Sequence, residues 1–220
     1  MLGAVCALAA AGVAAAATVT PPAGTPDLSS MVLQVSDLGA ASTVAAQGYF
    51  APVKDFSAEY VTDFANASTT DGVQYFSLQD GVMFAPDTAT PGAFLKYETA
   101  YFNSRKGRKQ FTRTIIRASG KKAHLKPSGI KYAFPGSIGV GDSSAVELLH
   151  VATKHFFFDE AIVLFTEGPV YGSLVIEGAV NQKVPTSDIV ALATATDSHI
   201  KAVLASTGAT GASGTTGATG

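Results

Sequence analysis

The spacing of apolar residues in the first half of the chain predicts a run of β-strands. Residues 43–50 (TVAAQGYF) and 56–64 (FSAEYVTDF) alternate apolar and polar positions, which is typical of strands that bury one face. Residues 72–85 (GVQYFSLQDGVMFA) continue as a third strand region, in which Gly81 is a possible point of interruption. Pro52 lies between the first two runs, so we expect it in the connecting loop.

Three further strand-like runs follow in the second half of the chain, at residues 145–152, 161–167 and 171–180. The stretch AIVLF at the start of the middle run is apolar at every position. A strand of that kind is buried on both of its faces, so we expect it near the centre of the sheet.

A first helix is predicted at residues 90–102 (TPGAFLKYETAYF). Thr90 is a suitable N-cap, and Pro91 would occupy the first helical position, where its missing N–H is not needed. Tyr97 and Tyr101 recur at the four-residue spacing of one helix face.

The next segment, residues 103–122 (NSRKGRKQFTRTIIRASGKK), can form a second helix. Phe111 and Ile115 would then supply its apolar stripe, and Gly107 would separate it from the first helix. A strand through residues 110–117 is an open alternative for the same segment.

The clearest helical pattern lies at residues 185–205, where Thr186, Ser187 or Asp188 could provide the N-cap. Taken together, these elements predict an α+β fold. We expect a curved antiparallel sheet with helices packed on one face and the C-terminal helix closing the domain.

Residues 1–17 are apolar, small and uncharged, and the chain then turns polar and Pro-rich. This pattern is that of a secretory signal peptide, so we expect a secreted or extracytoplasmic protein of the cell envelope. The single cysteine, Cys6, lies in this leader and its surroundings fit a lipoprotein signal poorly. A mature chain without cysteine would have no disulfides and no thiolate metal site.

The remaining chain divides into three segments by composition. Residues 18–27 form a Pro/Thr/Gly linker, residues 28–206 contain all the predicted elements and are expected to form one domain, and residues 207–220 are of low complexity. Glycine recurs at every third position of this last segment, as in collagen, but the repeat has no proline. We therefore interpret it as a flexible tail.

The charge of the chain is strongly segregated, although the net charge is only −2. Ten of the 15 Lys and Arg lie between Arg105 and Lys131, and there is no Asp or Glu from Thr99 to Val140. Such a segment produces a local positive field. The predicted binding residues for an anionic surface are Arg105, Lys106, Arg108, Lys109, Arg113 and Arg117.

Outside the cytoplasm, the partners that fit this segment are anionic lipid headgroups or phosphate-bearing cell-wall polymers. The leader argues against nucleic acid as the partner. The alternative is a solvated helix face whose charge is offset by the acidic remainder of the chain.

No catalytic motif stands out in the sequence. There is no G-x-S-x-G nucleophile turn and no phosphate-binding loop. His150 and His155 would point to opposite faces of a regular strand, so we expect no metal site, and Asp159–Glu160 is interpreted as a hairpin turn. The stretch GVGDSS (139–144) fits a turn better than an anion-binding nest. We expect no enzyme activity and no cofactor.

Two further functions remain open at this stage. The chain has 13 Phe and 7 Tyr, which could line a pocket for an apolar or lipid-like ligand, or could simply fill the core. Alternatively, the protein could be a structural module of the cell surface that is displayed by its glycine-repeat tail.

The order of several short motifs is similar to that of known secreted proteins. The motifs are SSMVLQVSDLG, QGYF, FSAEYVTDF, VGDSS and the closing helix IVALATATDSHIKAVL. They resemble a set of uncharacterised actinobacterial secreted proteins and, more remotely, the PsbP-like fold and mycobacterial secreted lipoproteins and kinase sensor domains. This resemblance implies a non-enzymatic extracytoplasmic domain with a curved antiparallel sheet backed by helices, and it supplies no site residues.

Overall fold

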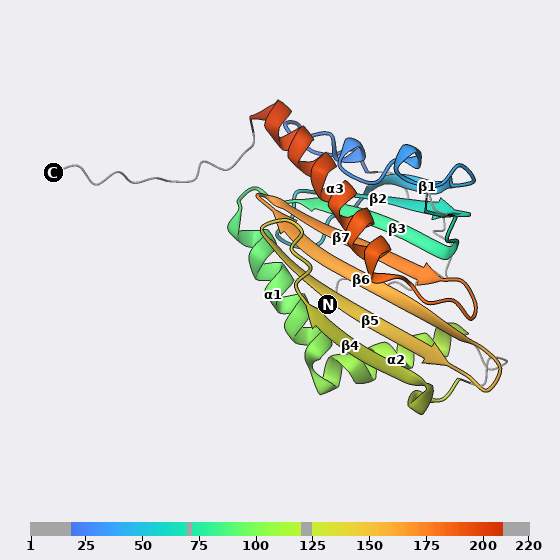
Figure 1. Ribbon diagram of the computed structural model, residues 1–220. Helices are drawn as coiled ribbons and strands as arrows, with labels where there is room; N and C mark the ends of the chain where they lie inside the picture. Colours follow the sequence, from blue (N-terminus) through green and yellow to red (C-terminus); the bar gives the residue numbers. More distant parts are fainter. Residues whose placement is uncertain (1–18, 70–71, 120–124, 209–220) are drawn as a thin grey trace.

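The computed structural model describes residues 19–69, 72–119 and 125–208, which form an antiparallel sheet covered by helices (Figure 1). The strands are β1 (Thr43–Phe50), β2 (Ala58–Ala65), β3 (Tyr75–Phe84), β4 (Ile130–Gly136), β5 (Ser143–Ala152), β6 (Phe157–Glu167) and β7 (Val170–Gly178). The helices are α1 (Ala89–Asn103), α2 (Arg105–Ser119) and α3 (Thr186–Thr207), with 3-10 turns η1 (Leu28–Ser30), η2 (Val35–Asp37) and η4 (Pro127–Gly129). The predicted leader and most of the predicted tail lie outside the described residues.

The seven strands lie in the order β1-β2-β3-β7-β6-β5-β4, and every neighbouring pair is antiparallel. Two meanders, β1–β3 and β4–β7, therefore meet where β3 pairs with β7. The α+β class and the antiparallel sheet are as predicted. β4 was not predicted, because its residues IKYAFPG combine a lysine, a proline and a glycine and are largely exposed.

Strand β6 lies inside the sheet and is buried on both faces, as its continuous apolar run predicts. Val163 and Phe165 belong to one apolar cluster, and Ile162 and Leu164 belong to another on the opposite side of the sheet. The helices are also distributed over the two faces of the sheet. The prediction that the helices pack on one face was wrong in this respect, since α3 packs in the first cluster and α1 and α2 pack in the second.

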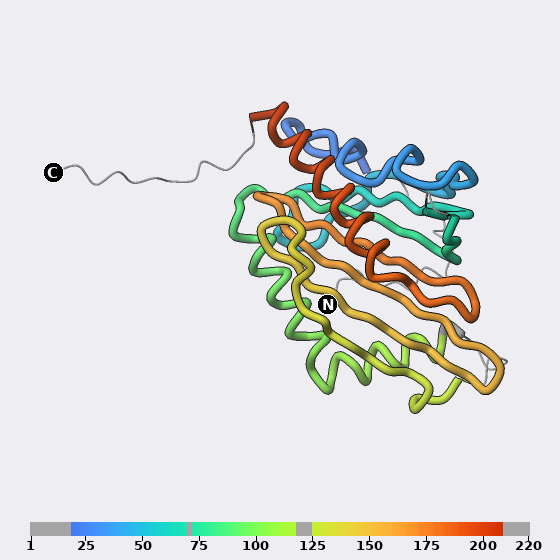
Figure 2. The backbone as a smooth tube through the Cα atoms, in the orientation of Figure 1, coloured from blue at the N-terminus to red at the C-terminus, as the bar shows by residue number. Residues whose placement is uncertain are grey.

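Helix α3 shares its face of the sheet with the N-terminal segment. Ile189 and Ile200 of α3 are buried together with Leu28 and Met31 of the segment around η1. Figure 2 shows this segment, in blue, beside the red trace of α3. The predicted side-chain N-cap of α3 is absent from the described contacts, because Pro185 occupies the N-cap position.

The opposite face of the sheet is covered by α1 and α2. Leu95 and Phe102 of α1 and Phe111 and Ile115 of α2 are all buried in this second cluster. The Phe102 and Phe111 ring centroids are 5.9 Å apart at an interplanar angle of 74°, a favourable edge-to-face contact. The open choice between helix and strand for residues 110–117 is thus settled as a helix.

The start of α1 differs from the prediction by two residues. The helix begins at Ala89, with Thr88 as N-cap, and the side chain of Asp87 receives hydrogen bonds from the backbone N–H groups of Ala89 and Thr90 at 2.8 Å each. A carboxylate satisfies these free N–H groups well, which explains why the helix starts before Pro91.

Three local predictions for the sheet can also be compared with the structure. Gly81 does not interrupt β3, which runs unbroken through that position. The interpretation of Asp159–Glu160 as a hairpin turn was wrong, because both residues lie within β6 and pair with β5. The actual turn between β5 and β6 lies around Thr153, whose backbone N–H donates to the carbonyl of Phe156 at 2.8 Å.

Candidate functional site

The basic helix α2 is fixed to α1 by a tight corner at Ser104. Ser104 ends α1, and its hydroxyl accepts a hydrogen bond from the backbone N–H of Gly107 at 2.9 Å in the first turn of α2. Gly107 was predicted to separate the helices, but it lies within α2. A Cβ atom at this position would lie 2.0 Å from the carbonyl oxygen of Tyr101, so glycine permits the close approach of the two helices.

One side of α2 is anchored to the sheet through β4. Phe111 and Ile115 are buried, and the Thr112 hydroxyl lies 2.7 Å from the Tyr132 hydroxyl of β4. Burial raises the pKa of Tyr132, so its phenol stays neutral and able to share this hydrogen bond. These contacts determine which side of α2 faces solvent.

The solvent-facing side of α2 carries the predicted basic residues. At 3.6 residues per turn, five of them fall within an arc of about 120°. All five are exposed, α2 contains no acidic residue, and no ion pair to any of the five occurs within the described part of the chain. We call this surface the basic face; it consists of Arg105, Lys106, Lys109, Arg113 and Arg117.

The sixth predicted residue, Arg108, does not belong to the basic face. Its guanidinium carbon lies 4.7 Å from the ring centroid of Phe134, and one terminal nitrogen lies 3.4 Å from the Asn103 side-chain oxygen. Arg108 thus points towards the sheet, because its position in the helix is close to that of Phe111 and Ile115.

Two tyrosines of α1 extend the surface around the basic face. The Tyr101 hydroxyl donates to the side chain of Gln110 on α2 at 2.9 Å, and the Tyr97 ring lies parallel to that of Tyr101 with centroids 6.5 Å apart. Tyr97 is 58% exposed. The sequence indicated the four-residue spacing of these tyrosines, but not that the adjoining helix would place basic residues beside them.

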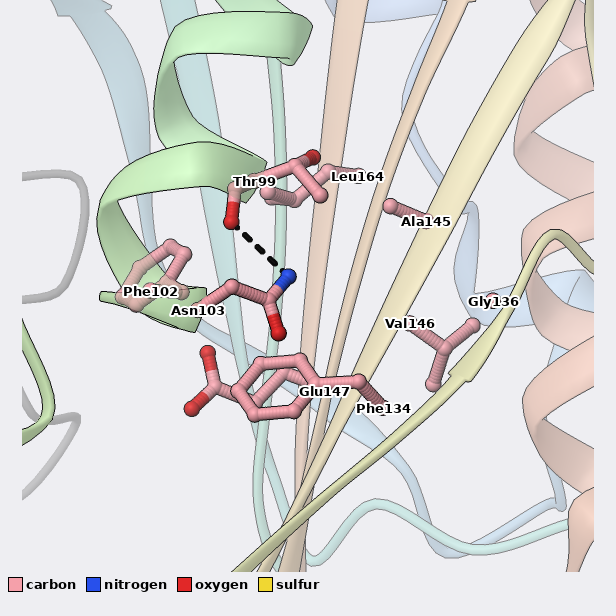
Figure 3. A pocket seen from close by; sticks show the side chains of 9 residues that line it. All are labelled: Thr99, Phe102, Asn103, Phe134, Gly136, Ala145, Val146, Glu147 and Leu164. Carbon is pink, nitrogen blue, oxygen red and sulfur yellow. Dashed lines mark hydrogen bonds between the residues drawn. The ribbon is translucent and has the colours of Figure 1, made fainter. Parts of the chain in front are cut away.

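A second candidate site is a pocket of about 250 Å³ between α1 and the strands β4, β5 and β6 (Figure 3). Its lining residues are Thr99, Phe102, Asn103, Phe134, Gly136, Ala145, Val146, Glu147 and Leu164. Only two of the chain's aromatic residues line it. Others pack against one another in the core, as Phe56, Phe94 and Tyr171 do. The pocket is also smaller than the roughly 300–1,000 Å³ of pockets for drug-sized ligands.

Glu147 is the charged side chain of this pocket. It is 4% exposed, and neither of its carboxylate oxygens has a hydrogen-bond partner among the described residues. Burial raises the pKa of Glu147 to about 7, although the positive charge of Arg108 acts in the opposite direction.

Two more carboxylates lie on the same face of the sheet, the buried Glu160 and the half-buried Glu177. Glu160 of β6 is directly opposite Glu177 of β7, and it is diagonal to Glu147 across the β5–β6 pair. Burial, followed by the charges of Glu177 and Glu147, raises the pKa of Glu160 to about 8. The sequence did not indicate this group, because each residue comes from a different strand.

The histidines do not form a site with each other. His150 Nδ1 lies 2.6 Å from a carboxylate oxygen of Asp159, the residue opposite it on β6, while His155 is exposed in the β5–β6 turn. Nowhere in the described ranges do three His, Cys, Asp or Glu side chains gather in a way that could hold a metal ion.

The GVGDSS stretch forms a turn, the reading favoured from the sequence. The backbone N–H of Asp142 donates to the carbonyl of Thr166 at 2.7 Å, and the Asp142 side chain accepts from the N–H of Gly168 at 2.8 Å. The N–H of Asp142 in this stretch is therefore used within the protein.

No family model and no curated protein sequence matches the chain. Among solved structures, the fold is similar to that of the extracellular domain of PknH from Mycobacterium tuberculosis, with a TM-score of 0.50 and 10% sequence identity. The match covers 83% of this chain and 98% of that domain. The predicted resemblance to a kinase sensor domain is thereby confirmed for the fold. The resemblance to actinobacterial secreted proteins and to the PsbP-like fold stays a prediction.

Proposed function

We propose that the protein is an extracytoplasmic, non-enzymatic binding module that docks on an anionic membrane surface through the basic face. The observation that carries this proposal is the set of five exposed cations on one side of α2, without an acidic neighbour on the helix and without an ion pair in the described ranges. A face of this kind retains its full charge for an external anion.

The expected strength of docking is moderate. Each Lys or Arg near an anionic membrane contributes about 1 kcal/mol, so five contribute roughly 5 kcal/mol before salt screening. That free energy supports reversible binding that weakens at high ionic strength.

An anionic lipid surface is favoured over a cell-wall polymer because of Tyr97. This side chain is 58% exposed on the helix next to the basic face. Tyrosine is enriched where protein meets the membrane–water interface, since its ring is apolar and its hydroxyl is polar. A soluble anionic polymer offers no comparable apolar layer in which the Tyr97 ring could be buried.

The location rests on two supporting observations. Residues 1–17 have the apolar pattern of a secretory leader, and the domain of similar fold is extracellular in its own protein. None of the helices in the described residues combines the length and hydropathy that crossing a bilayer requires.

The test is binding of the protein to vesicles of phosphatidylglycerol and phosphatidylcholine, compared with pure phosphatidylcholine, across a salt series. The test variant is Lys106→Gln/Lys109→Gln/Arg113→Gln. The control is Lys54→Gln/Lys154→Gln/Lys183→Gln, which removes the same charge from exposed lysines in three loops. All three proteins carry the same leader, so differences between them report the substituted residues alone.

We expect the wild type and the control to bind anionic vesicles, and the test variant to bind at least about tenfold more weakly. Equal binding by all three would refute docking through the basic face. If the wild type binds a soluble phosphate-bearing polymer more tightly than the vesicles, the partner is the polymer and not the membrane.

A further inference from the structure

The pocket beside α1 contains a feature that surface docking does not use. It is lined mainly by apolar groups, and Figure 3 shows the Glu147 side chain extending from β5 towards α1. Buried polar groups normally have hydrogen-bond partners, and leaving a buried acceptor without one is costly. Both Glu147 oxygens nevertheless accept no hydrogen bond from the described residues.

A nearby cation does not satisfy this carboxylate. Arg108 is close enough to affect Glu147 electrostatically, but its guanidinium lies over Phe134 and forms no ion pair with a described carboxylate. Glu160 lies diagonal to Glu147 across the β5–β6 pair, and it carries negative charge when ionised. At pH 8 the ionised Glu147 and the partly ionised Glu160 together exceed the charge of the half-buried Arg108, so the field at the pocket favours a positively charged guest.

The pocket also contains a second polar atom without a partner. The Thr99 side-chain oxygen is buried and has no hydrogen-bond partner in the described residues, and Thr99 is part of the lining. It can accept a hydrogen bond from a guest held at Glu147, because a hydroxyl has two acceptor lone pairs.

We propose that this pocket binds a small primary amine with an apolar body, whose ammonium group donates hydrogen bonds to Glu147. The apolar body lies against Phe102, Phe134 and Leu164. This site is separate from the proposed membrane docking, which depends on the exposed side of α2.

The size of the pocket limits the guest. A water molecule in the liquid occupies about 30 Å³, so about 250 Å³ corresponds to roughly eight water-sized groups. A single aromatic ring with a one-carbon aminomethyl arm is of that size, whereas a long acyl chain is not. The same limit disfavours this pocket as the site of a long-chain lipid-like ligand, one of the alternatives left open by the aromatic content.

The experiment is calorimetric titration of the protein with benzylamine at pH 8. At this pH Glu147 is largely ionised, because its pKa is about 7, and an alkyl amine is still protonated. Benzyl alcohol and benzoate serve as neutral and anionic probes of the same size. The test variant is Glu147→Gln, which keeps the shape of the side chain.

The matched control is Glu59→Gln. Glu59 lies on β2, burial raises its pKa to about 7 as well, and it does not line the pocket. We expect saturable binding of benzylamine to the wild type and to the control, weakened at least about tenfold in Glu147→Gln. Benzyl alcohol should bind the wild type and Glu147→Gln equally.

Three outcomes would overturn the proposal. They are the absence of saturable benzylamine binding to the folded wild type, equal benzylamine affinity of wild type and Glu147→Gln, and tighter binding of benzoate than of benzylamine. The last would identify Arg108 as the ligand-binding charge in place of Glu147. Circular dichroism of each variant establishes that it is folded, so a loss of binding is not confused with unfolding.

Discussion

The hydroxyl of Thr196 in α3 donates a hydrogen bond of 2.8 Å to the carboxylate of Asp80 in β3, and both residues are fully buried. The same carboxylate oxygen accepts the backbone N–H of Leu33 at 2.7 Å. One buried side chain thus joins the sheet, the C-terminal helix and the N-terminal segment. Burial raises the pKa of Asp80 to about 7, and these two hydrogen bonds act in the opposite direction.

Replacing Thr196 by valine should destabilise the protein by about 1–3 kcal/mol. Valine keeps the shape of threonine but removes the donor, so the buried carboxylate loses one of its hydrogen bonds. Urea unfolding followed by circular dichroism measures the change. The control is Thr194→Val, an exposed position of the same helix, which should change the free energy of unfolding by less than about 0.5 kcal/mol. Equal effects at both positions would contradict a stabilising role of the Asp80 contact.

Two glycines, one in α1 and one in α2, should respond to alanine in opposite directions. Gly107→Ala places a Cβ atom 2.0 Å from the backbone oxygen of Tyr101, so the helices must move apart, at a cost of about 1–3 kcal/mol. Gly92→Ala in α1 meets nothing within 4 Å and should stabilise by about 0.5–1 kcal/mol. Thermal unfolding of both variants checks the prediction, and destabilisation by Gly92→Ala would show that the first turns of α1 are packed differently.

Stability should decrease as the pH rises from 5 to 8, because of the buried carboxylates. The pKa of Glu160 is about 8 in the folded protein against an ordinary value of 4.5, so the folded state retains a proton that the unfolded state loses between these values. Each pKa unit corresponds to about 1.4 kcal/mol. The stabilisation is complete below pH 4.5, is lost as the pH passes towards 8, and does not change further above that.

The variant Glu160→Gln should reduce this pH dependence by roughly 2 kcal/mol between pH 5 and pH 8, as measured by urea unfolding at each pH. If Glu160→Gln unfolds with the same pH dependence as the wild type, Glu160 is not protonated in the folded state at neutral pH.

The elements that the sequence predicted well are those in which a local pattern determines the outcome. The alternation in β2 and the continuous apolar run of β6 follow from burial on one and on two faces of the strand. β1 was also predicted from its alternation, although it is a largely exposed edge strand. β4 was not predicted because it is an exposed edge strand. It forms by pairing with β5, and its own composition does not indicate a strand.

For the candidate sites, too, features set by a local pattern could be predicted, whereas features set by contacts between distant segments could not. The basic face could be predicted because its residues follow one another at helical spacing in a single segment. The same spacing places Arg108 close to Phe111 and Ile115, on the side of the helix that faces the sheet, but its contact with Phe134 of β4 could not be predicted. The Glu147 pocket depends in the same way on contacts between α1 and three strands that are far apart in the sequence.

The contribution of the exposed Tyr97 ring to membrane binding is not tested by substitutions of the basic residues, so it is predicted separately. Tyr97→Ala should weaken binding to anionic vesicles about fivefold while leaving the salt dependence unchanged, because a ring at the interface contributes apolar burial and not charge. Vesicle co-sedimentation across a salt series measures both quantities. The control is Phe76→Ala, which removes an aromatic ring that is 64% exposed on β3 and should have no effect on binding. A change in salt slope for Tyr97→Ala, or an equal loss for Phe76→Ala, would mean that the ring does not contact the lipid as proposed.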